Sequence, residues 1–130
     1  MSENEHDIQN KIRLAVGKAQ AGVLFRANVG VGWNGEIVNR SANRLVLSNP
    51  HRLATGLPNG FPDLFGYRKT KITPEMIGKE IAVFAFLEIK TKKGKPTEAQ
   101  QRMHEFLKKD GAIGGIARSP EEALKLLNEM

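Results

Sequence analysis

A carboxylate and an ammonium group close the longest apolar run of the sequence, residues 81–90. If this run is a strand, alternate side chains share a face, so Glu88 and Lys90 point the same way, about 7 Å apart. Ile89 then points to the other face, into the core. Charged groups are costly to half-bury without a partner or a task. The plainer alternative is that the strand reaches the surface at Glu88.

A second carboxylate, Asp63, lies in the segment 60–66, Gly-Phe-Pro-Asp-Leu-Phe-Gly. Pro62 favours an extended backbone, and an apolar stretch follows Asp63. The separation of twenty-five residues between Asp63 and Glu88 is long enough for their strands to pair. Two carboxylates and a lysine would then gather at one end of a sheet. Alternatively, Asp63 is an ordinary turn residue.

The donor types indicate which cation such a cluster would hold. The sequence has no Cys, and its three His residues show no pairing at zinc spacing. Oxygen donors without thiolates favour Mg²⁺ or Mn²⁺. A bound cation lowers the pKa of water and stabilises charge on a phosphoryl oxygen, while a neighbouring lysine can hold that water. Phosphodiester hydrolysis needs all three contributions.

Two further polar residues are candidates for the same site. Glu5 lies within about 20° of Ile12 on a helical wheel, on the apolar stripe of its helix. The competing interpretation pairs Glu5 with Ser2 in a capping box. Gln100 lies in the helix that directly follows the lysine-rich turn, so a short connection would carry it to the rim of the site. Alternatively, Gln100 is a surface amide.

Periodicity and turn signals supply the elements that must position these residues. Ser119-Pro120-Glu121-Glu122 has an N-cap, an N1 proline and an N3 glutamate in order, so it predicts the start of a helix. The sequence predicts helices over 3–18, 97–109 and 120–128, strands over 23–28, 62–68, 81–90 and 112–117, and a loop-rich β excursion over 29–60 with strand-like pieces at 36–39 and 44–47. This pattern predicts one α/β domain over residues 1–130.

Composition bounds the class of protein. The chain has 130 residues, a hydrophobic fraction of 40% and a charged fraction of 26%, which is ordinary globular usage. No apolar run approaches the roughly 18 residues of a membrane span. The first ten residues are acidic and polar, unlike a secretory signal. With no Cys, we expect a cytoplasmic protein.

The net charge of +6 is concentrated in one stretch. Residues 66–95 carry eight Lys and Arg against three acids, and the densest part is 90–95. A concentrated cationic stretch favours an anionic partner. The candidates for contacts with a DNA backbone are Arg68, Lys69, Lys71, Lys92, Lys93 and Lys95. The alternative for the lysine cluster is a solvated turn.

These motifs, in this order, resemble the PD-(D/E)xK nuclease superfamily, and more narrowly the virus-type replication-repair nuclease (VRR-NUC) family. The resemblance rests on Pro62-Asp63, on Glu88-Ile89-Lys90 and on the segment 91–100, Thr-Lys-Lys-Gly-Lys-Pro-Thr-Glu-Ala-Gln. It extends to Arg-Ala-Asn-Val-Gly at 26–30 and Gly-Ile-Ala-Arg-Ser at 115–119. The resemblance therefore covers most of the chain. The chain is similar to the stand-alone phage or bacterial type, which implies the cytoplasm of a bacterium or of a phage-infected host cell.

The resemblance implies a single restriction-endonuclease-like domain, with a central mixed β-sheet flanked by α-helices. It implies a Mg²⁺- or Mn²⁺-dependent endodeoxyribonuclease, with Asp63, Glu88 and the carbonyl oxygen of Ile89 on the metal. Lys90 would orient the attacking water. Glu5, as a further ligand, and Gln100 match the family's helix glutamate and downstream glutamine.

Compact stand-alone members of the family are similar to Holliday-junction resolvases and act as homodimers. We therefore expect cleavage of branched DNA by a homodimer, since a two-fold arrangement presents two sites to a junction. The excursion 29–60 would contribute to the dimer interface or complete the core. The alternatives are a sequence-specific restriction-like endonuclease and a non-catalytic nucleic-acid-binding protein of the same fold.

Overall fold

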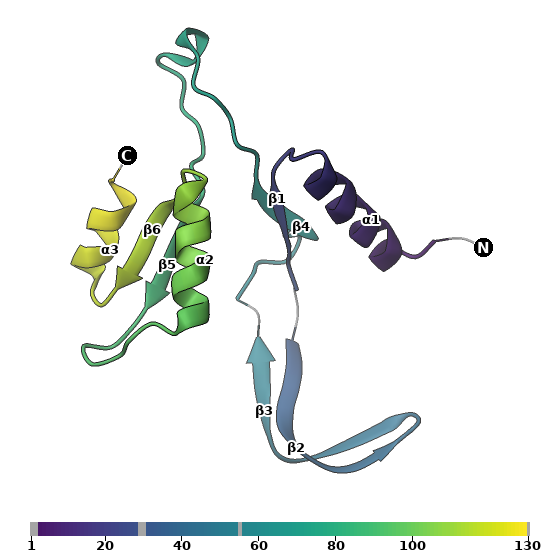
Figure 1. Cartoon of the computed structure of the whole chain (residues 1–130). Helices are drawn as coiled ribbons and strands as arrows, with labels where there is room; N and C mark the ends of the chain where they lie inside the picture. The colour runs from purple at the N-terminus through teal and green to yellow at the C-terminus, as the bar shows by residue number, and fades with distance from the viewer. Residues whose placement is uncertain (1–2, 29–30, 55, 130) are drawn as a thin grey trace. The chain divides into compact units, whose positions relative to one another are not determined.

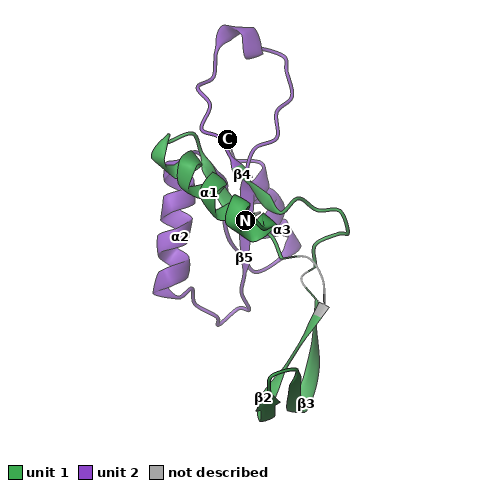
Figure 2. Cartoon of the chain, turned by 90° about the vertical axis from the view of Figure 1, so that its right-hand side faces the viewer, with its two compact units in different colours: residues 1–66 green, residues 67–130 purple. Residues whose placement is uncertain are grey.

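The computed structural model describes residues 3–28, 31–54 and 56–129, and this part of the chain contains three α-helices, a short 3₁₀ helix and six strands (Figure 1). The predicted mixed α/β class is confirmed. The described strands pair two by two, as β1 with β4, β2 with β3, and β5 with β6. The chain divides into two compact units, residues 1–66 and 67–130, coloured separately in Figure 2.

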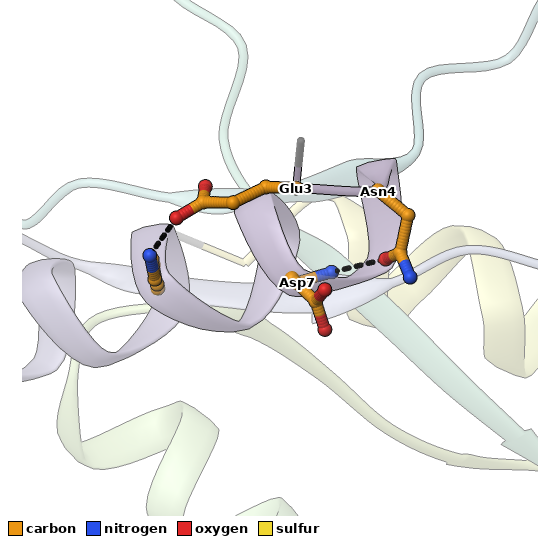
Figure 3. A network of polar contacts seen from close by, with 4 residues as sticks. Glu3, Asn4 and Asp7 are labelled. Carbon is orange, nitrogen blue, oxygen red and sulfur yellow. Dashed lines mark hydrogen bonds and ion pairs between the residues drawn. The ribbon is translucent and has the colours of Figure 1, made fainter. Parts of the chain in front are cut away.

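Helix α1 (Glu5–Lys18) opens the first unit. Its N-cap is Asn4, whose side-chain oxygen accepts a hydrogen bond from the Asp7 N–H at 2.9 Å (Figure 3). Glu5 is therefore the first residue of the helix and not its N3 residue, so the proposed capping box of Ser2 and Glu5 is wrong; Ser2 itself lies outside the described residues. Neither Ile8 nor Ile12 is buried, so the apolar stripe of this helix is half exposed.

Strands β1 (Val23–Arg26) and β4 (Leu64–Tyr67) form a two-stranded sheet at the predicted positions. The backbones approach closely at Gly66, where an added Cβ would lie 1.9 Å from the carbonyl oxygen of Val23. The rings of Phe25 and Phe65 pack against each other across the pair, tilted, with centroids 5.9 Å apart. The aromatic packing and the glycine together fix how these strands meet.

The excursion 29–60 contains a long antiparallel ribbon, formed by β2 (Val31–Ser41) and β3 (Arg44–Ala54). The predicted strand-like pieces at 36–39 and 44–47 lie inside these longer strands. The ribbon contains two irregularities, near Gly35 and Val38, where the cross-strand register shifts. Trp33 is 63% exposed, so it does not complete a core as one interpretation of the excursion required.

The second unit is built on a β–α–β arrangement. Strands β5 (Ala85–Ile89) and β6 (Ile113–Ala117) are parallel, and helix α2 (Glu98–Lys109) connects them. Strand β5 is shorter than the predicted strand 81–90, because residues 81–84 do not join it. The most buried apolar side chains among the described residues are Leu107, 5% exposed, and Ala117, 1% exposed.

Helix α3 (Pro120–Leu127) follows β6, as its capping signal predicted. The Ser119 hydroxyl accepts a hydrogen bond from the Glu122 N–H at 3.2 Å. In β6, Gly114 has φ +148°, and an added Cβ would lie 1.9 Å from the Phe86 carbonyl oxygen. Gly114 is therefore required by the close approach of β5.

The 3₁₀ helix η1 (Pro74–Met76) lies in the long connection between β4 and β5 and was not predicted. Proline at its first position suits a short helical turn. Of the described helices, none combines the length and the apolar character needed to cross a membrane.

Candidate functional site

Asp63 lies immediately before β4, in the first unit. Its carbonyl oxygen accepts a hydrogen bond from the Ala27 N–H at 2.9 Å, which ties this residue to the end of β1. The side chain is exposed. Because the backbone is held and the side chain is exposed, Asp63 can offer its oxygens to a ligand without disturbing the sheet.

Two adjoining hollows meet at Asp63. We call the first the Asp63 pocket; it has a volume of about 390 Å³ and is lined by His6, Gln9, Arg26, Ala27, Asn28, Gly60, Phe61 and Asp63. We call the second the Glu5 groove; it has a volume of about 290 Å³ and is lined by Glu5, Ile8, Gln9, Ile12, Asp63 and Leu64. Asp63 and Gln9 line both hollows.

The Glu5 groove brings two of the predicted site residues together. Glu5 lines it from α1, and Asp63 lines it from the segment before β4. Ile8 and Ile12, on the following turns of α1, also line it. The helical wheel predicted that Glu5 lies on the side of Ile8 and Ile12, and the groove agrees with this. Two carboxylates in one groove create a local negative charge that favours a cation.

Of the residues that line the Asp63 pocket, only Asp63 was a predicted site residue, and the polar residues that the prediction missed are His6, Gln9, Arg26 and Asn28. Gln9 is four residues after Glu5 on one helix, so helical spacing alone could have indicated it. Arg26 is half-buried, and its Nη2 donates a hydrogen bond to the Asn10 side chain at 3.1 Å. Its buried Nε has no hydrogen-bond partner within the described residues. Arg26 therefore contributes a positive charge to the lining of the Asp63 pocket.

Glu88 and Lys90 lie in the second unit, at the carboxyl end of β5. The burial of β5 alternates, and Glu88 and Lys90 are half-buried while Ile89, between them, is 67% exposed. The two charged residues share a face as predicted, but the prediction that Ile89 points into the core is wrong. The half-buried face also carries Phe86, whose ring packs at a tilt against His104 of α2 with centroids 4.9 Å apart, and this packing decides which face is covered.

The backbone on either side of Lys90 is closely held. Its N–H donates a hydrogen bond to the Ala117 carbonyl oxygen at 3.2 Å, which continues the ladder between β5 and β6. The Gly94 N–H then donates to the Thr91 carbonyl oxygen at 3.1 Å and closes a tight turn. We call residues 91–95 the lysine turn, because Lys92, Lys93 and Lys95 are exposed on it.

Gln100 has a structural task at the start of α2. Its side-chain oxygen accepts a hydrogen bond from the Thr97 N–H at 2.9 Å, and its own N–H donates to the Thr97 hydroxyl at 3.1 Å. This reciprocal pair is a capping box. Among the residues that the structure describes, the amide NH₂ of this half-buried side chain has no hydrogen-bond acceptor, so any role of Gln100 at the site would use that donor.

Among the cationic candidates after β4, Lys69 differs from its neighbours. Its ammonium forms an ion pair with Asp110 at 3.4 Å, so its charge is partly offset. Asp110 also accepts a hydrogen bond from the Tyr67 hydroxyl at 2.8 Å. Arg68 and Lys71 are exposed and form no ion pair within the residues that the structure describes.

The Tyr67–Asp110 bond shifts both pKa values. The pKa of the Asp110 carboxyl lies below its usual value, first because Tyr67 donates a hydrogen bond to it and further because of Lys69; partial burial opposes this. Burial raises the pKa of Tyr67 to about 12, and the hydrogen bond and negative charge of Asp110 add to the shift. This network belongs to the architecture of the second unit.

The donor chemistry of the Glu5 groove suits Mg²⁺ or Mn²⁺. Mg²⁺ is usually held by one or two carboxylates and keeps several waters, and this groove supplies two carboxylates. Across residues 3–28, 31–54 and 56–129, no three His, Asp or Glu side chains lie together as a metal-binding group. A divalent cation in this groove would therefore be held by the carboxylates of Glu5 and Asp63, with water completing its coordination.

Comparison with protein-family models, with curated protein sequences and with solved structures gives no match to this chain.

Proposed function

We propose that the chain is a Mg²⁺- or Mn²⁺-dependent endonuclease that hydrolyses phosphodiester bonds in DNA, preferably in branched DNA such as Holliday junctions. The observation that carries the proposal is the groove that Glu5 and Asp63 line together, with Arg26 in the adjoining pocket. The order of the Pro62-Asp63 and Glu88-Ile89-Lys90 motifs, which resembles that of the VRR-NUC family, supports the rest. The proposal includes the fold that this resemblance implies, a single restriction-endonuclease-like domain with a central mixed sheet.

The proposal gives each residue a distinct task. Asp63, Glu88, Glu5 and the carbonyl oxygen of Ile89 are assigned to the cation. When bound, Mg²⁺ would lower the pKa of water and offset the charge that develops on the phosphoryl oxygens. Lys90 is half-buried as a residue, and its ammonium group would donate a hydrogen bond to the attacking water and orient it.

The reaction consumes one water for each bond that is cut. The water oxygen forms a bond to phosphorus as the bond from phosphorus to the leaving sugar oxygen breaks. The proton that the water loses is balanced by the proton that the leaving oxygen gains. One DNA fragment ends in a phosphate monoester and the other in a hydroxyl group.

The cationic side chains define how DNA would be bound. The lysine turn, with Arg68 and Lys71, supplies positive charge for contacts with the phosphate backbone. Such contacts carry no base information, so they favour recognition of DNA structure over sequence. A homodimer would present two sites to a four-way junction.

Incubation with labelled duplex, flap and four-way-junction DNA tests the proposal. We expect cleavage that requires Mg²⁺ or Mn²⁺, stops in EDTA and is fastest on the branched substrates. Asp63→Asn and Lys90→Ala should abolish turnover, while DNA binding survives. Glu3→Gln is the matched control, because this carboxylate pairs with Lys11.

Three outcomes separate the alternatives. Cleavage at one defined duplex sequence, with no preference for branched DNA, would indicate a restriction-like enzyme. DNA binding without cleavage in either metal would indicate a non-catalytic binding protein. Near wild-type turnover of Asp63→Asn or Lys90→Ala would show that the assigned site is wrong.

A further inference from the structure

The β2–β3 ribbon is exposed on both faces near its turn. Every residue from Glu36 to Leu45 is exposed. The register pairs Arg40 with Leu45 and Ser41 with Arg44. Because successive cross-strand pairs point to opposite faces, the two arginines flank the turn and extend from opposite sides of the ribbon.

The charged residues of this ribbon are mostly positive. Residues 31–54 contain three arginines, Arg40, Arg44 and Arg52, against the single acid Glu36, and none of the chain's lysines. Within the described part of the chain, none of the three guanidinium groups forms an ion pair. The ribbon thus presents unneutralised positive charge to solvent, which complements a polyanion.

The uncharged residues around the turn suit the same kind of ligand. Asn39 and Asn43 are exposed beside the arginines. Arginine makes bidentate hydrogen bonds to guanine edges, and asparagine makes them to adenine edges. The exposed apolar side chains of Ile37 and Val38 can contact sugars and thymine methyl groups. A two-stranded ribbon also fits the B-DNA major groove, which is about 12 Å wide.

We propose that the β2–β3 ribbon is a DNA-binding arm that enters the major groove of a duplex, with Arg40 and Arg44 as its principal contacts. The inference rests on the proposed function, because it takes DNA as the substrate. It adds a second DNA-binding surface to the lysine turn, on residues that the sequence motifs did not single out. The DNA that the ribbon would bind is opposite to it in charge.

A second copy of the chain is the less favoured occupant. A two-fold contact around the turn would place Arg40 and Arg44 near their own symmetry copies, and like charges that face one another are destabilising. The one acid of the ribbon, Glu36, cannot neutralise three arginines. DNA meets no such repulsion.

The test measures the affinity of the full chain for a labelled four-way junction in EDTA, where no cleavage is expected. Arg40→Ala with Arg44→Ala should weaken binding about tenfold or more and reduce the slope of log affinity against log salt by about 1–2. Arg40→Lys with Arg44→Lys should keep the salt slope but still bind more weakly, because lysine cannot make the bidentate contact. Far-UV circular dichroism and thermal melts verify that each variant is folded.

The charge-matched control is Lys108→Ala with Lys109→Ala, which removes two exposed cations from the end of α2. It should change affinity no more than about twofold. The arm is refuted if the arginine variant binds like the wild type, or if it loses affinity no more than this control. If the arginine variant and the wild type differ in oligomeric state when they sediment without DNA, the ribbon is a contact between two copies of the chain, and the DNA-binding arm is refuted.

The two proposals fail separately. A wild type that binds and cuts DNA, with an arginine variant that binds equally well, removes the arm and leaves the nuclease. A wild type that binds DNA through Arg40 and Arg44 but cuts nothing removes the nuclease and leaves the arm. A wild type without affinity for DNA removes both.

Discussion

The guanidinium group of Arg118 donates a hydrogen bond to the carbonyl oxygen of Gly94 over 2.6 Å. The N–H of Arg118 in turn donates to the Glu122 carboxylate, also over 2.6 Å. These two bonds connect the lysine turn, the end of β6 and the first turn of α3. The conformation of the turn that follows Lys90 therefore depends on a side chain 24 residues further along the chain.

Arg118→Ala should loosen the lysine turn without unfolding the second unit. Loss of a charge-assisted hydrogen bond at an exposed site should speed hydrogen exchange of residues 90–96 by about three- to tenfold. Exchange measured by mass spectrometry checks this. Arg102→Ala is the control, since Arg102 pairs only weakly with Glu98 on its own helix. Equal exchange in both variants would show that Arg118 does not hold the turn.

Gly114→Ala should destabilise the second unit strongly. The new Cβ would lie 1.9 Å from the Phe86 carbonyl oxygen, at a φ of +148° that side chains rarely adopt. We expect a loss of about 3 kcal/mol or more in the free energy of unfolding, measured by denaturant titration. Gly17→Ala is the opposite case, because its Cβ would meet nothing within 4 Å in helix α1. That change should stabilise by about 0.5–1 kcal/mol. Similar effects of the two substitutions would contradict the described strand pairing.

The Tyr67–Asp110 bond predicts a stability profile with two limbs. The pKa of Asp110 is lowered in the folded state, so its contribution is complete above the ordinary value of 3.8 and is lost as the pH falls through the folded value. The pKa of Tyr67 is raised to about 12, so its contribution is complete below 10.0 and is lost as the pH rises from there toward 12. Melting temperatures against pH measure both limbs.

Single substitutions separate these limbs. Tyr67→Phe should remove the alkaline loss and shrink the acid one, because the phenol is also the hydrogen-bond donor to Asp110. Asp110→Asn should remove the acid loss. A wild-type curve that is flat between pH 10 and 12 would contradict the assignment.

Lys92→Ala with Lys93→Ala should weaken binding to all DNA substrates to a similar extent. Two lost phosphate contacts should reduce the salt slope by about 1–2 units. Lys79→Ala with Lys125→Ala removes two exposed lysines outside the proposed surface and serves as the control. An unchanged salt slope for Lys92→Ala with Lys93→Ala would indicate that the lysine turn contributes to solubility and not to DNA binding.

Glu5→Gln and Asp63→Asn should each weaken Mn²⁺ binding to the proposed metal site, because both carboxylates line one groove. Titration of the DNA-free protein with Mn²⁺, followed by its paramagnetic resonance signal, reports binding without any cleavage. We expect at least about a tenfold loss for each variant. Glu3→Gln should bind Mn²⁺ as the wild type does, since Glu3 pairs with Lys11 beside the N-cap (Figure 3). A Glu5→Gln variant with unaltered affinity would remove Glu5 from the metal ligands.

Local sequence signals predicted the helices well. The Ser119-Pro120 start of α3 and the periodicity of α2 gave the correct elements within a residue or two. The start of α1 was misjudged, because Asn4 competes with Ser2 as a cap and residue types alone do not rank them. The strands of the excursion were predicted too short, because irregular cross-strand pairing hides the alternation by which a strand is recognised.

The residue types by themselves determined the chemistry available to this protein: hard oxygen donors without thiolates, lysines beside a carboxylate, and a surplus of positive charge. They also placed Glu5 on one helix side with Ile8 and Ile12, since that depends on helical spacing alone. Only the tertiary structure decided that Asp63 shares a groove with Glu5, that Ile89 lies on the exposed face of β5, and that Gln100 caps its own helix. These depend on which elements pack together, and that is set by long-range packing and backbone hydrogen bonds, which no local pattern contains.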